Sequence, residues 1–418
     1  MKQNNKPNAL YVAFHYPPIL GSSGVHRTLA FTRHLSEKGW KVTVLTASLK
    51  SYVKWAEDQF SFIPKDVKVI RAFGRDTSRH FSWRNKYLSW MALPDNWQSW
   101  IFGGFFAGLW SILRQRPDVI VSTYPIASAH CIGYLLHRIT GVPWVADLRD
   151  PMAQDDYPTE PRKKKCFVWI ENKIVKHCAK AIVTTPGAKI FYQQKFPDIA
   201  DEFWQVLPNG FDETIFSQIA ESETIDKAAG PYILMHSGVI YPSERDPTQL
   251  FQAVSELKQE GIINSKKIKI RLRATGHDSL FIQQINFLDI GDIFELQPPI
   301  PYKQALSEMF EVDALLLLQA ANCNYQIPAK AYEYLRVQKP VLALTPKVGD
   351  TGQLLDKAGV ANIADLDDKQ QIKTALTDFI YKLEEGNFEF DNLDKLQRFS
   401  RQQQAITFEK ILQQTMSV

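Results

Sequence analysis

The sequence has few of the residues that mark disulfide-rich, metal-binding or nucleic-acid-binding proteins. Only four of its 418 residues are cysteine, and they lack the paired spacing of a zinc or redox site, which indicates reduced thiols. The formal net charge is only +4, and no segment concentrates basic residues as a nucleic-acid-binding face does. We therefore expect no zinc or redox site and no nucleic-acid partner.

Long hydrophobic runs are also missing. The most apolar window, Trp100 to Leu113, has the sequence WIFGGFFAGLWSIL and falls short of the roughly 20 residues that a membrane-spanning helix needs. We expect a helix packed in the core, while the preceding tryptophans, Trp83, Trp90 and Trp97, leave open a helix that lies in a membrane interface. The opening MKQNNKPNAL lacks the apolar core of a signal peptide, so a cytoplasmic location is expected.

The sequence does contain a regular alternation of apolar strand patterns and amphipathic helix patterns, which predicts parallel, doubly wound sheets. A length of 418 residues exceeds one ordinary core and predicts two domains of about 200 residues each. The predicted strands are 9–15, 41–47, 118–124, 142–148, 181–185 and 204–210 in the first half, and 231–238, 267–276, 293–299, 313–319 and 340–345 in the second.

A polar, weakly periodic stretch from 212 to 230 separates the two halves. We therefore predict an N-terminal domain at 1–211, a C-terminal domain at 212–392, and a final polar helix within 393–418 that packs back across both. The expected fold class is α/β, with two Rossmann-like parallel-sheet domains facing across a cleft. Loops at the carboxyl ends of the strands would line that cleft and carry the function.

The first candidate loop is HYPPILGSSGVHR, from His15 to Arg27. Gly21 and Gly24 allow backbone amides to approach a ligand at the start of the following helix. The G-x-x-G spacing lacks the order of the dinucleotide-binding fingerprint. On the residues alone, His15 and Arg27 are as readily structural as functional.

The second candidate loop is DLRDPM, where a predicted strand ends in Asp147, Arg149 and Asp150. Charged groups at the carboxyl end of a strand point toward the ligand-binding edge of a parallel sheet, which favours binding or proton transfer. An internal Asp–Arg pair that only fixes the loop is an equally good explanation.

Two further loops follow strands of the second half. In HSGVIYPSERDP, Ser237 and Gly238 form a turn and Arg245 offers a forked donor to an anion. In IPAKAYEYLRVQKPVLAL, Pro328 can open a helix whose start attracts anions. On that helix, Lys330 could neutralise phosphate and Glu333 could accept bonds from ribose hydroxyls, although a solvated glutamate on a core helix is the simpler reading.

Taken together, the segments HYPPILGSSG, PDVIVSTYP, VADLRD, VLPNGFD, HSGVIYPSERDP and IPAKAYEYLRVQKPVLAL make the chain resemble GT-B glycosyltransferases. The resemblance is to the large retaining family, group 1 or family 4-like, that uses nucleotide-sugar donors, and it covers nearly the whole chain. It implies a hexosyltransferase that moves a sugar from a nucleotide-diphosphate sugar to a hydroxyl of a polysaccharide or lipid-linked glycan, with retention of configuration. It implies no metal and no cofactor, because the nucleotide sugar is a substrate.

The resemblance also assigns roles to the candidate residues. The donor would bind the second domain, and the acceptor the first, where Asp147 and Asp150 are the acceptor-side candidates. The residues concerned are Asp150, Asp147 and Arg149 for catalysis; Ser237, Gly238, Arg245, Lys330 and Glu333 for the donor; and His15, Gly21, Gly24 and Arg27 for the glycine loop and acceptor.

Two positions depart from the family pattern. The family has two glutamates separated by seven residues; Glu333 matches the second, whereas the first falls at Tyr325. The family also has an arginine six residues before a lysine; Arg245 takes the place of the lysine, whereas the arginine falls at Val239. We expect Lys330 or Arg273 to supply the missing positive charge.

Two other functions remain open. One is a sugar-nucleotide epimerase of similar two-domain form, which needs no acceptor. The other is a non-catalytic nucleotide-sugar binding protein or assembly partner, favoured by the missing charges. A lipid-linked acceptor would bring the tryptophan-rich region and the basic run at 162–165 to the inner face of an anionic membrane, so peripheral membrane contact is a further hypothesis.

Overall fold

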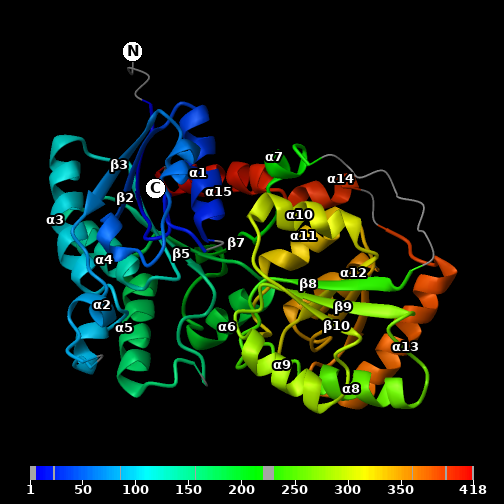
Figure 1. Ribbon diagram of the computed structural model, residues 1–418. Helices are drawn as coiled ribbons and strands as arrows, with labels where there is room; N and C mark the ends of the chain where they lie inside the picture. Colours follow the sequence, from blue (N-terminus) through cyan, green and yellow to red (C-terminus); the bar gives the residue numbers. More distant parts are fainter. Residues whose placement is uncertain are drawn as a thin grey trace. The chain divides into compact units, whose positions relative to one another are not determined.

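The computed structural model describes residues 6–21, 24–84, 86–155, 157–219, 230–359, 361–390 and 393–416. They form two compact units, which Figure 1 shows in sequence colours. The N-terminal unit comprises residues 1–209 together with 401–418, and the C-terminal unit comprises residues 210–400. Each unit is built on one parallel sheet.

The sheet of the N-terminal unit has seven strands in the order β3-β2-β1-β4-β5-β6-β7. Its central strands are apolar on both faces, as expected of a parallel sheet covered by helices on both sides. The strands are β1 (Asn8–Val12), β2 (Lys41–Ala47), β3 (Val67–Ala72), β4 (Val119–Thr123), β5 (Trp144–Arg149), β6 (Lys180–Val183) and β7 (Trp204–Val206). The helices are α1 (Gly24–Glu37), α2 (Thr77–His80), α3 (Ser99–Arg114), α4 (Ser128–Thr140), α5 (Pro161–His177), α6 (Pro186–Lys195) and α15 (Arg401–Met416).

Side chains of alternate residues along a strand pack into two separate cores, one on each face of the sheet. Tyr11 of β1 packs with α1 and α15 on one face, where Phe31 and Phe408 stack with ring centroids 4.4 Å apart. Leu10 and Val12 face the other side and join the core beneath α3 and α4. The period of two along the strand therefore assigns helices to both faces of the sheet.

The C-terminal unit has a six-stranded sheet in the order β10-β9-β8-β11-β12-β13. Its strands are β8 (Tyr232–Ser237), β9 (Ile268–Arg273), β10 (Phe294–Gln297), β11 (Ala314–Leu318), β12 (Val341–Leu344) and β13 (Ala361–Ala364). Its helices are α7 (Glu213–Phe216), α8 (Thr248–Gln259), α9 (Asp278–Phe287), α10 (Tyr302–Glu311), α11 (Ala329–Val337), α12 (Asp350–Ala358), α13 (Lys369–Glu385) and α14 (Leu393–Leu396). In both sheets the first strand of the unit lies in the interior, next to its second and fourth strands.

The predicted fold class is confirmed, because both units are parallel α/β sheets. All the predicted strands are present within a few residues, but β3 and β13 were not predicted. Both lie at an edge of their sheet. Edge strands have a neighbour on one side only, so they are not required to be uniformly apolar and give a weaker pattern.

The chain passes from the N-terminal to the C-terminal unit between Asn209 and Gly210, near the predicted boundary after residue 211. The predicted final helix is interrupted: α14 belongs to the C-terminal unit, and α15 belongs to the N-terminal unit. Helix α15 is held there by Glu409, whose carboxylate accepts from Trp40 Nε1 at 3.0 Å and contacts His34 Nε2 at 2.9 Å. The interruption falls where the chain returns to the first unit, after Ser400.

The prediction that Trp100–Leu113 forms a core helix is right for one face only. Trp100, Gly104 and Gly108 of α3 are buried, whereas Phe102 and Trp110 on the other face are 66% and 52% exposed. Among the residues that the structure describes, no helix is long and apolar enough to cross a membrane.

Candidate functional site

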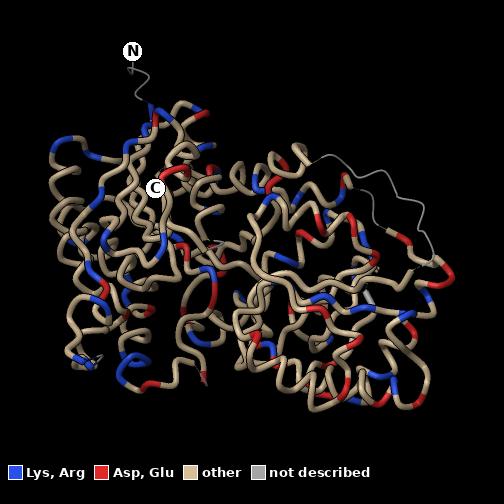
Figure 2. Tube along the Cα trace, viewed as in Figure 1, with Lys and Arg blue, Asp and Glu red and all other residues tan. Residues whose placement is uncertain are grey.

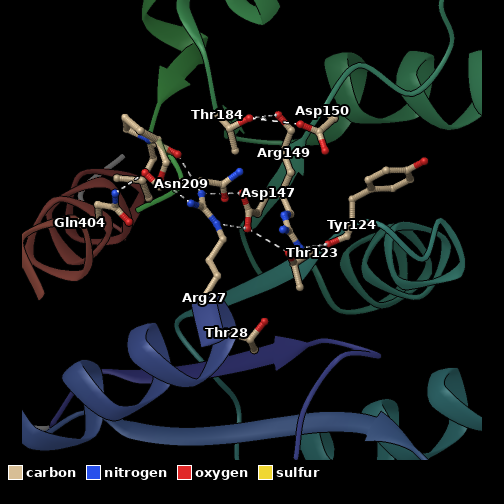
Figure 3. Close-up of polar contacts among 12 residues, drawn as sticks. Arg27, Thr28, Thr123, Tyr124, Asp147, Arg149, Asp150, Thr184, Asn209 and Gln404 are labelled. Atoms are coloured by element: carbon tan, nitrogen blue, oxygen red, sulfur yellow. Dashed lines mark hydrogen bonds and ion pairs between the residues drawn. The ribbon is translucent and has the colours of Figure 1, made fainter. Parts of the chain in front are cut away.

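The carboxyl end of β5 carries a buried ion pair between Arg27 and Asp147 (Figure 3). Arg27 Nη2 lies 3.1 Å from Asp147 Oδ1, and Arg27 Nε donates to Oδ2 at 3.2 Å. The same guanidinium donates to the backbone carbonyls of Pro208, at 2.8 Å, and Leu207, at 3.1 Å. Asp147 also accepts from Thr123 Oγ1 at 2.9 Å.

These contacts tie together α1, β4, β5 and the loop after β7. The side chains of Arg27 and Asp147 are 1% and 0% exposed, so solvent does not reach either. A buried ion pair is stable only when its remaining donors and acceptors are also satisfied, as they are here. The geometry therefore supports a structural role for this pair. Arg149 and Asp150, which follow Asp147, remain candidates for contact with a ligand.

Arg149 has a left-handed backbone, with φ of 62°, which is uncommon for a residue other than glycine. The β5–β6 register shifts between Asp147 and Arg149, so a bulge redirects the chain at this point. Arg149 Nη1 donates to the Tyr124 carbonyl at 3.3 Å, while Arg149 Nε is buried and has no hydrogen-bond partner among the described residues. Backbone strain beside an unsatisfied donor is typical of a functional site.

Asp150 points away from the ion pair and lies beside Thr184, as Figure 3 shows. Thr184 Oγ1 donates to its carboxylate at 3.3 Å. Burial raises the pKa of Asp150, and the neighbouring Arg149 acts in the opposite direction. A carboxyl group in this position can hold or accept a proton more readily than an exposed aspartate.

His15 follows β1 at the same edge of the sheet, where burial and the positive charge of Arg149 lower its pKa to about 3. The imidazole is therefore neutral at physiological pH. Gly21 has φ of +79°, and a Cβ there would meet nothing within 4 Å, so backbone conformation alone favours glycine. Gly24 is the first residue of α1. Two residues of the predicted glycine loop, 22 and 23, lie outside the described residues.

In the C-terminal unit, His236 near the end of β8 holds Lys330 from α11. His236 Nδ1 lies 3.0 Å from the Leu316 carbonyl, so it carries the proton, and Nε2 accepts from Lys330 Nζ at 3.0 Å. Burial, and then the charge of Lys330, keep the pKa of His236 well below its usual range. Burial and Arg245 lower the pKa of Lys330 to about 7, although Glu333 acts to raise it.

The turn after β8 leaves room for that lysine. Gly238 has φ of +112°, and a Cβ there would lie 3.0 Å from both Cε and Nζ of Lys330. The amide of the preceding Ser237 lies 3.4 Å from the Tyr334 hydroxyl. Arg245 is half-exposed, with Nη1 donating to the Val239 carbonyl at 3.1 Å. The loop after β8 and the first turn of α11 thus bring two cationic side chains together.

Glu333 lies one turn further along α11 and is 6% exposed. The Tyr302 hydroxyl, at the start of α10, donates to Glu333 Oε1 at 2.5 Å. A carboxylate oriented in this way keeps acceptor capacity for a hydroxyl-bearing ligand. Lys330 and Glu333 are three residues apart, so one helical face presents both an ammonium and a carboxylate.

The two positions that depart from the family pattern carry uncharged side chains at the surface: Val239 and Tyr325 are each 37% exposed. Arg273, one of the two residues expected to supply the missing charge, already has an acidic partner. Its guanidinium is 10% exposed and pairs with Glu308 through Nε and Nη2, while Nη1 donates to the Pro298 carbonyl at 2.7 Å. Of the two candidates, only Lys330 is directed at the turn after β8.

Sequence reasoning missed His236 and Tyr302 as members of the site. His236 could have been found, because it is the penultimate residue of a strand that leads into a candidate loop. Tyr302 lies 31 residues from Glu333, and no local pattern connects the two.

Two parallel α/β units of this kind define the GT-B class of proteins, and solved GT-B structures match nearly the whole chain. Sucrose-phosphate synthase from Thermosynechococcus elongatus is 11% identical, covers 99% of this chain and 100% of its own, and has a TM-score of 0.69. Anabaena HepE in complex with UDP is 13% identical over 97% of this chain and 100% of its own, with a TM-score of 0.66.

A putative UDP-N-acetylglucosamine 2-epimerase from Listeria monocytogenes is also similar, at 11% identity over 97% of this chain and 95% of its own, with a TM-score of 0.58. No curated protein sequence matches this chain. Residues 23–210 match the glycosyl transferase 4-like domain. The sequence of the N-terminal unit is thus similar to the glycosyl transferase 4-like domain, and the fold of the whole chain is that of the GT-B class.

Proposed function

We propose that this protein transfers a sugar, of the hexose type, from a nucleotide-diphosphate sugar to a hydroxyl of a polysaccharide or lipid-linked acceptor. The observation that carries the proposal is the arrangement of Lys330, Gly238 and Glu333 in the C-terminal unit. Gly238, which has no Cβ, leaves space for the cation of Lys330 at the turn after β8. The buried carboxylate of Glu333 lies on the same helix as Lys330. UDP in the similar HepE structure supports a nucleotide-sugar donor.

In the proposed reaction, Lys330 and Arg245 stabilise the negative charge that develops on the departing diphosphate, with help from the start of α11. Glu333, oriented by Tyr302, accepts hydrogen bonds from the ribose hydroxyls. These side chains supply the charge stabilisation without a metal ion or a cofactor. The acceptor hydroxyl attacks the face from which the nucleotide leaves, which gives retention of configuration.

The acceptor is proposed to bind the N-terminal unit near Asp150, Arg149 and His15. The Nε of Arg149 is available to a polar acceptor group, and Asp150 can receive the hydroxyl proton. We further propose that the protein acts in surface polysaccharide or glycolipid synthesis on the cytoplasmic side of a membrane. This setting follows from a lipid-linked acceptor.

The donor assignment is tested by thermal unfolding of the purified protein with a panel of nucleoside diphosphates and their sugars. We expect one nucleotide to raise the melting temperature, because a ligand that binds only the folded state stabilises it. Glu333→Ala should abolish the shift, whereas Glu311→Ala, at an exposed position on α10, should retain it. No shift with any nucleotide would refute the donor site and favour a non-catalytic role.

An epimerase is the second candidate, because the Listeria structure carries that title and shares the fold. The two reactions differ in their need for an acceptor. Release of nucleoside diphosphate that depends on an added glycan or lipid-linked acceptor supports the transferase. A changed nucleotide sugar without any acceptor supports the epimerase.

A further inference from the structure

Helix α3 exposes an apolar stripe on the outside of the N-terminal unit. Phe102, Phe106, Trp110 and Leu113 are 66%, 52%, 52% and 78% exposed, and their spacing of four, four and three residues puts them on one side of the helix. Single exposed apolar residues are ordinary, but a contiguous stripe of large side chains marks an interaction site.

The opposite face of α3 fixes the stripe in place. A Cβ at Gly104 would lie 2.5 Å from Ile132 Cδ1, and one at Gly108 would lie 2.7 Å from Leu136 Cδ1. The backbone of α3 therefore packs directly on side chains of α4. A larger side chain at either inner position would have to displace Ile132 or Leu136, so this close packing holds α3 with its aromatic stripe on the outside.

The segment that leads into α3 is aromatic and basic. Trp83, Leu88 and Trp90 are 79%, 62% and 57% exposed. Residues 77–114 include four basic side chains, Arg79, Arg84, Lys86 and Arg114. The only acid in this sequence range, Asp95, is buried and accepts from the Ser128 amide at 2.7 Å and its hydroxyl at 2.8 Å.

Hydrogen bonds connect this segment to α3 and to α5. Ser99, the first residue of α3, accepts from the amide of Arg75 at 2.9 Å and donates to its carbonyl at 3.1 Å. Arg162, in the first turn of α5, donates to Ser89 Oγ at 3.2 Å. Arg162 begins a run of four basic residues, 162–165. Figure 2 shows blue stretches at the lower end of the N-terminal unit, near α2 and at the start of α5.

Two of these parts, the segment that leads into α3 and the start of α5, lie at the same edge of the sheet as the candidate acceptor residues. The segment 77–93 follows β3, and α5 follows β5, so both begin at carboxyl ends of parallel strands. Arg149 and Asp150 stand at the carboxyl end of β5. We define the basic aromatic surface as the stripe of α3, residues 77–84 and 86–93, and residues 162–165.

We propose that the basic aromatic surface binds the interface of an anionic lipid membrane. The assignment deepens the proposed function, on which it rests for the lipid-linked acceptor, and it identifies the residues that make the contact. Indole and phenyl rings are favourable at the level of lipid headgroups, and lysine and arginine are attracted by anionic lipids. Arg114, stacked 3.6 Å from the Trp110 ring centroid, combines both properties.

Charge decides between a membrane and a second copy of this chain. A two-fold dimer would place the same basic side chains opposite each other, with the exposed Glu160 beside the run 162–165 as a nearby acid, so the excess of like charge is repulsive. An anionic bilayer offers negative headgroups to the basic side chains and an apolar interface to the aromatic stripe. The surface therefore favours lipid as the occupant.

The test is flotation of the full chain with vesicles of phosphatidylcholine alone or of equimolar phosphatidylcholine and phosphatidylglycerol. We expect the protein to float with the anionic vesicles, and to be released by high salt because the attraction is electrostatic. F106S/W110S should lower the partition coefficient about tenfold, through lost apolar burial. Arg84→Glu with Lys86→Glu should remove the preference for anionic lipid.

The matched control is Phe287→Ser, which replaces an aromatic residue that is 89% exposed in the C-terminal unit and should leave flotation unchanged. Equal flotation of wild type and F106S/W110S would overturn the proposal, as would a dimer that these substitutions dissociate. Nucleotide-induced thermal stabilisation is measured on the same samples. If it is absent while anionic vesicles still bind, the donor site fails and the membrane surface stands.

Discussion

The two units share a sheet topology, yet they differ in where their aromatic and charged side chains lie. All ten tryptophans of the chain fall in the N-terminal unit, and Trp55, Trp83, Trp90, Trp110 and Trp169 are exposed there. The C-terminal unit has no tryptophan and instead holds a compact group of His236, Lys330 and Glu333. One fold thus supports a surface suited to large partners in one unit and a polar site suited to a small anion in the other.

The buried charges of the two units also differ in what they leave unsatisfied. Arg27 and Asp147 satisfy each other and the surrounding carbonyls, which suits a structural clamp. Lys330 donates to the neutral His236, and its pKa is lowered to about 7 by burial and Arg245. Burial disfavours the charged form of Lys330, and a bound anion would stabilise that form. Lys330 is therefore suited to binding a diphosphate.

The largest expected effect is on stability, through the clamp. Arg27→Met leaves Asp147 buried without its partner, which should lower the free energy of unfolding by about 3–5 kcal/mol. Chemical denaturation measures the change. Arg138→Met, at an exposed position in the same unit, should change stability by less than about 0.5 kcal/mol. Equal stability of Arg27→Met and wild type would show that the pair is not a structural clamp.

The second effect concerns donor binding. Lys330→Met should weaken the affinity for a nucleoside diphosphate about 100-fold, because a charge-assisted hydrogen bond in a buried site is worth about 1.5–3 kcal/mol. Isothermal titration measures the dissociation constant. Lys347→Met, in which an exposed lysine is replaced, is the control and should bind as wild type. Unchanged affinity in Lys330→Met would remove this residue from the site, whereas vesicle binding should be normal in both variants.

The third effect is a pH dependence of donor affinity. The pKa of Lys330 is about 7 in the free protein, where Arg245 and Glu333 are its charged neighbours and His236 stays neutral. An anionic diphosphate raises that pKa, so binding takes up a proton above pH 7 and none well below it. Affinity for a nucleotide sugar should be flat below pH 7 and should fall up to about tenfold per pH unit above it. Lys330→Met should abolish this slope; a slope that persists would assign the proton to another group.

The smallest effect concerns the orientation of Glu333. Tyr302→Phe removes the hydroxyl that donates to Glu333 Oε1 at 2.5 Å, and we expect donor affinity to fall about three- to tenfold. Tyr381→Phe, at a tyrosine that is 60% exposed on α13, should have no effect. Titration with the same nucleotide measures both. A fall as large as that of Glu333→Ala would instead indicate direct contact between Tyr302 and the donor.

Sequence patterns predicted the two sheets because buried parallel strands are runs of apolar residues, as in β4 and β11. They also located the loops that follow β1, β5 and β8, since candidate side chains stand at strand ends. The edge strands β3 and β13 were missed because one exposed side weakens their pattern. The apolar window of α3 was assigned to the core, because composition does not show which face of a helix is covered.

The amino-acid sequence by itself determined the fold class, the family resemblance and the segments that carry the candidate residues, because each depends on periodicity or spacing along the chain. Only the tertiary structure decided that Arg27 and Asp147 form a clamp, that Arg273 is occupied by Glu308, and that His236 holds Lys330. The partners in these contacts are separated by 35 to 120 residues. Whether a charge is satisfied or left for a ligand depends on which distant side chains fold against it, and local sequence does not encode that choice.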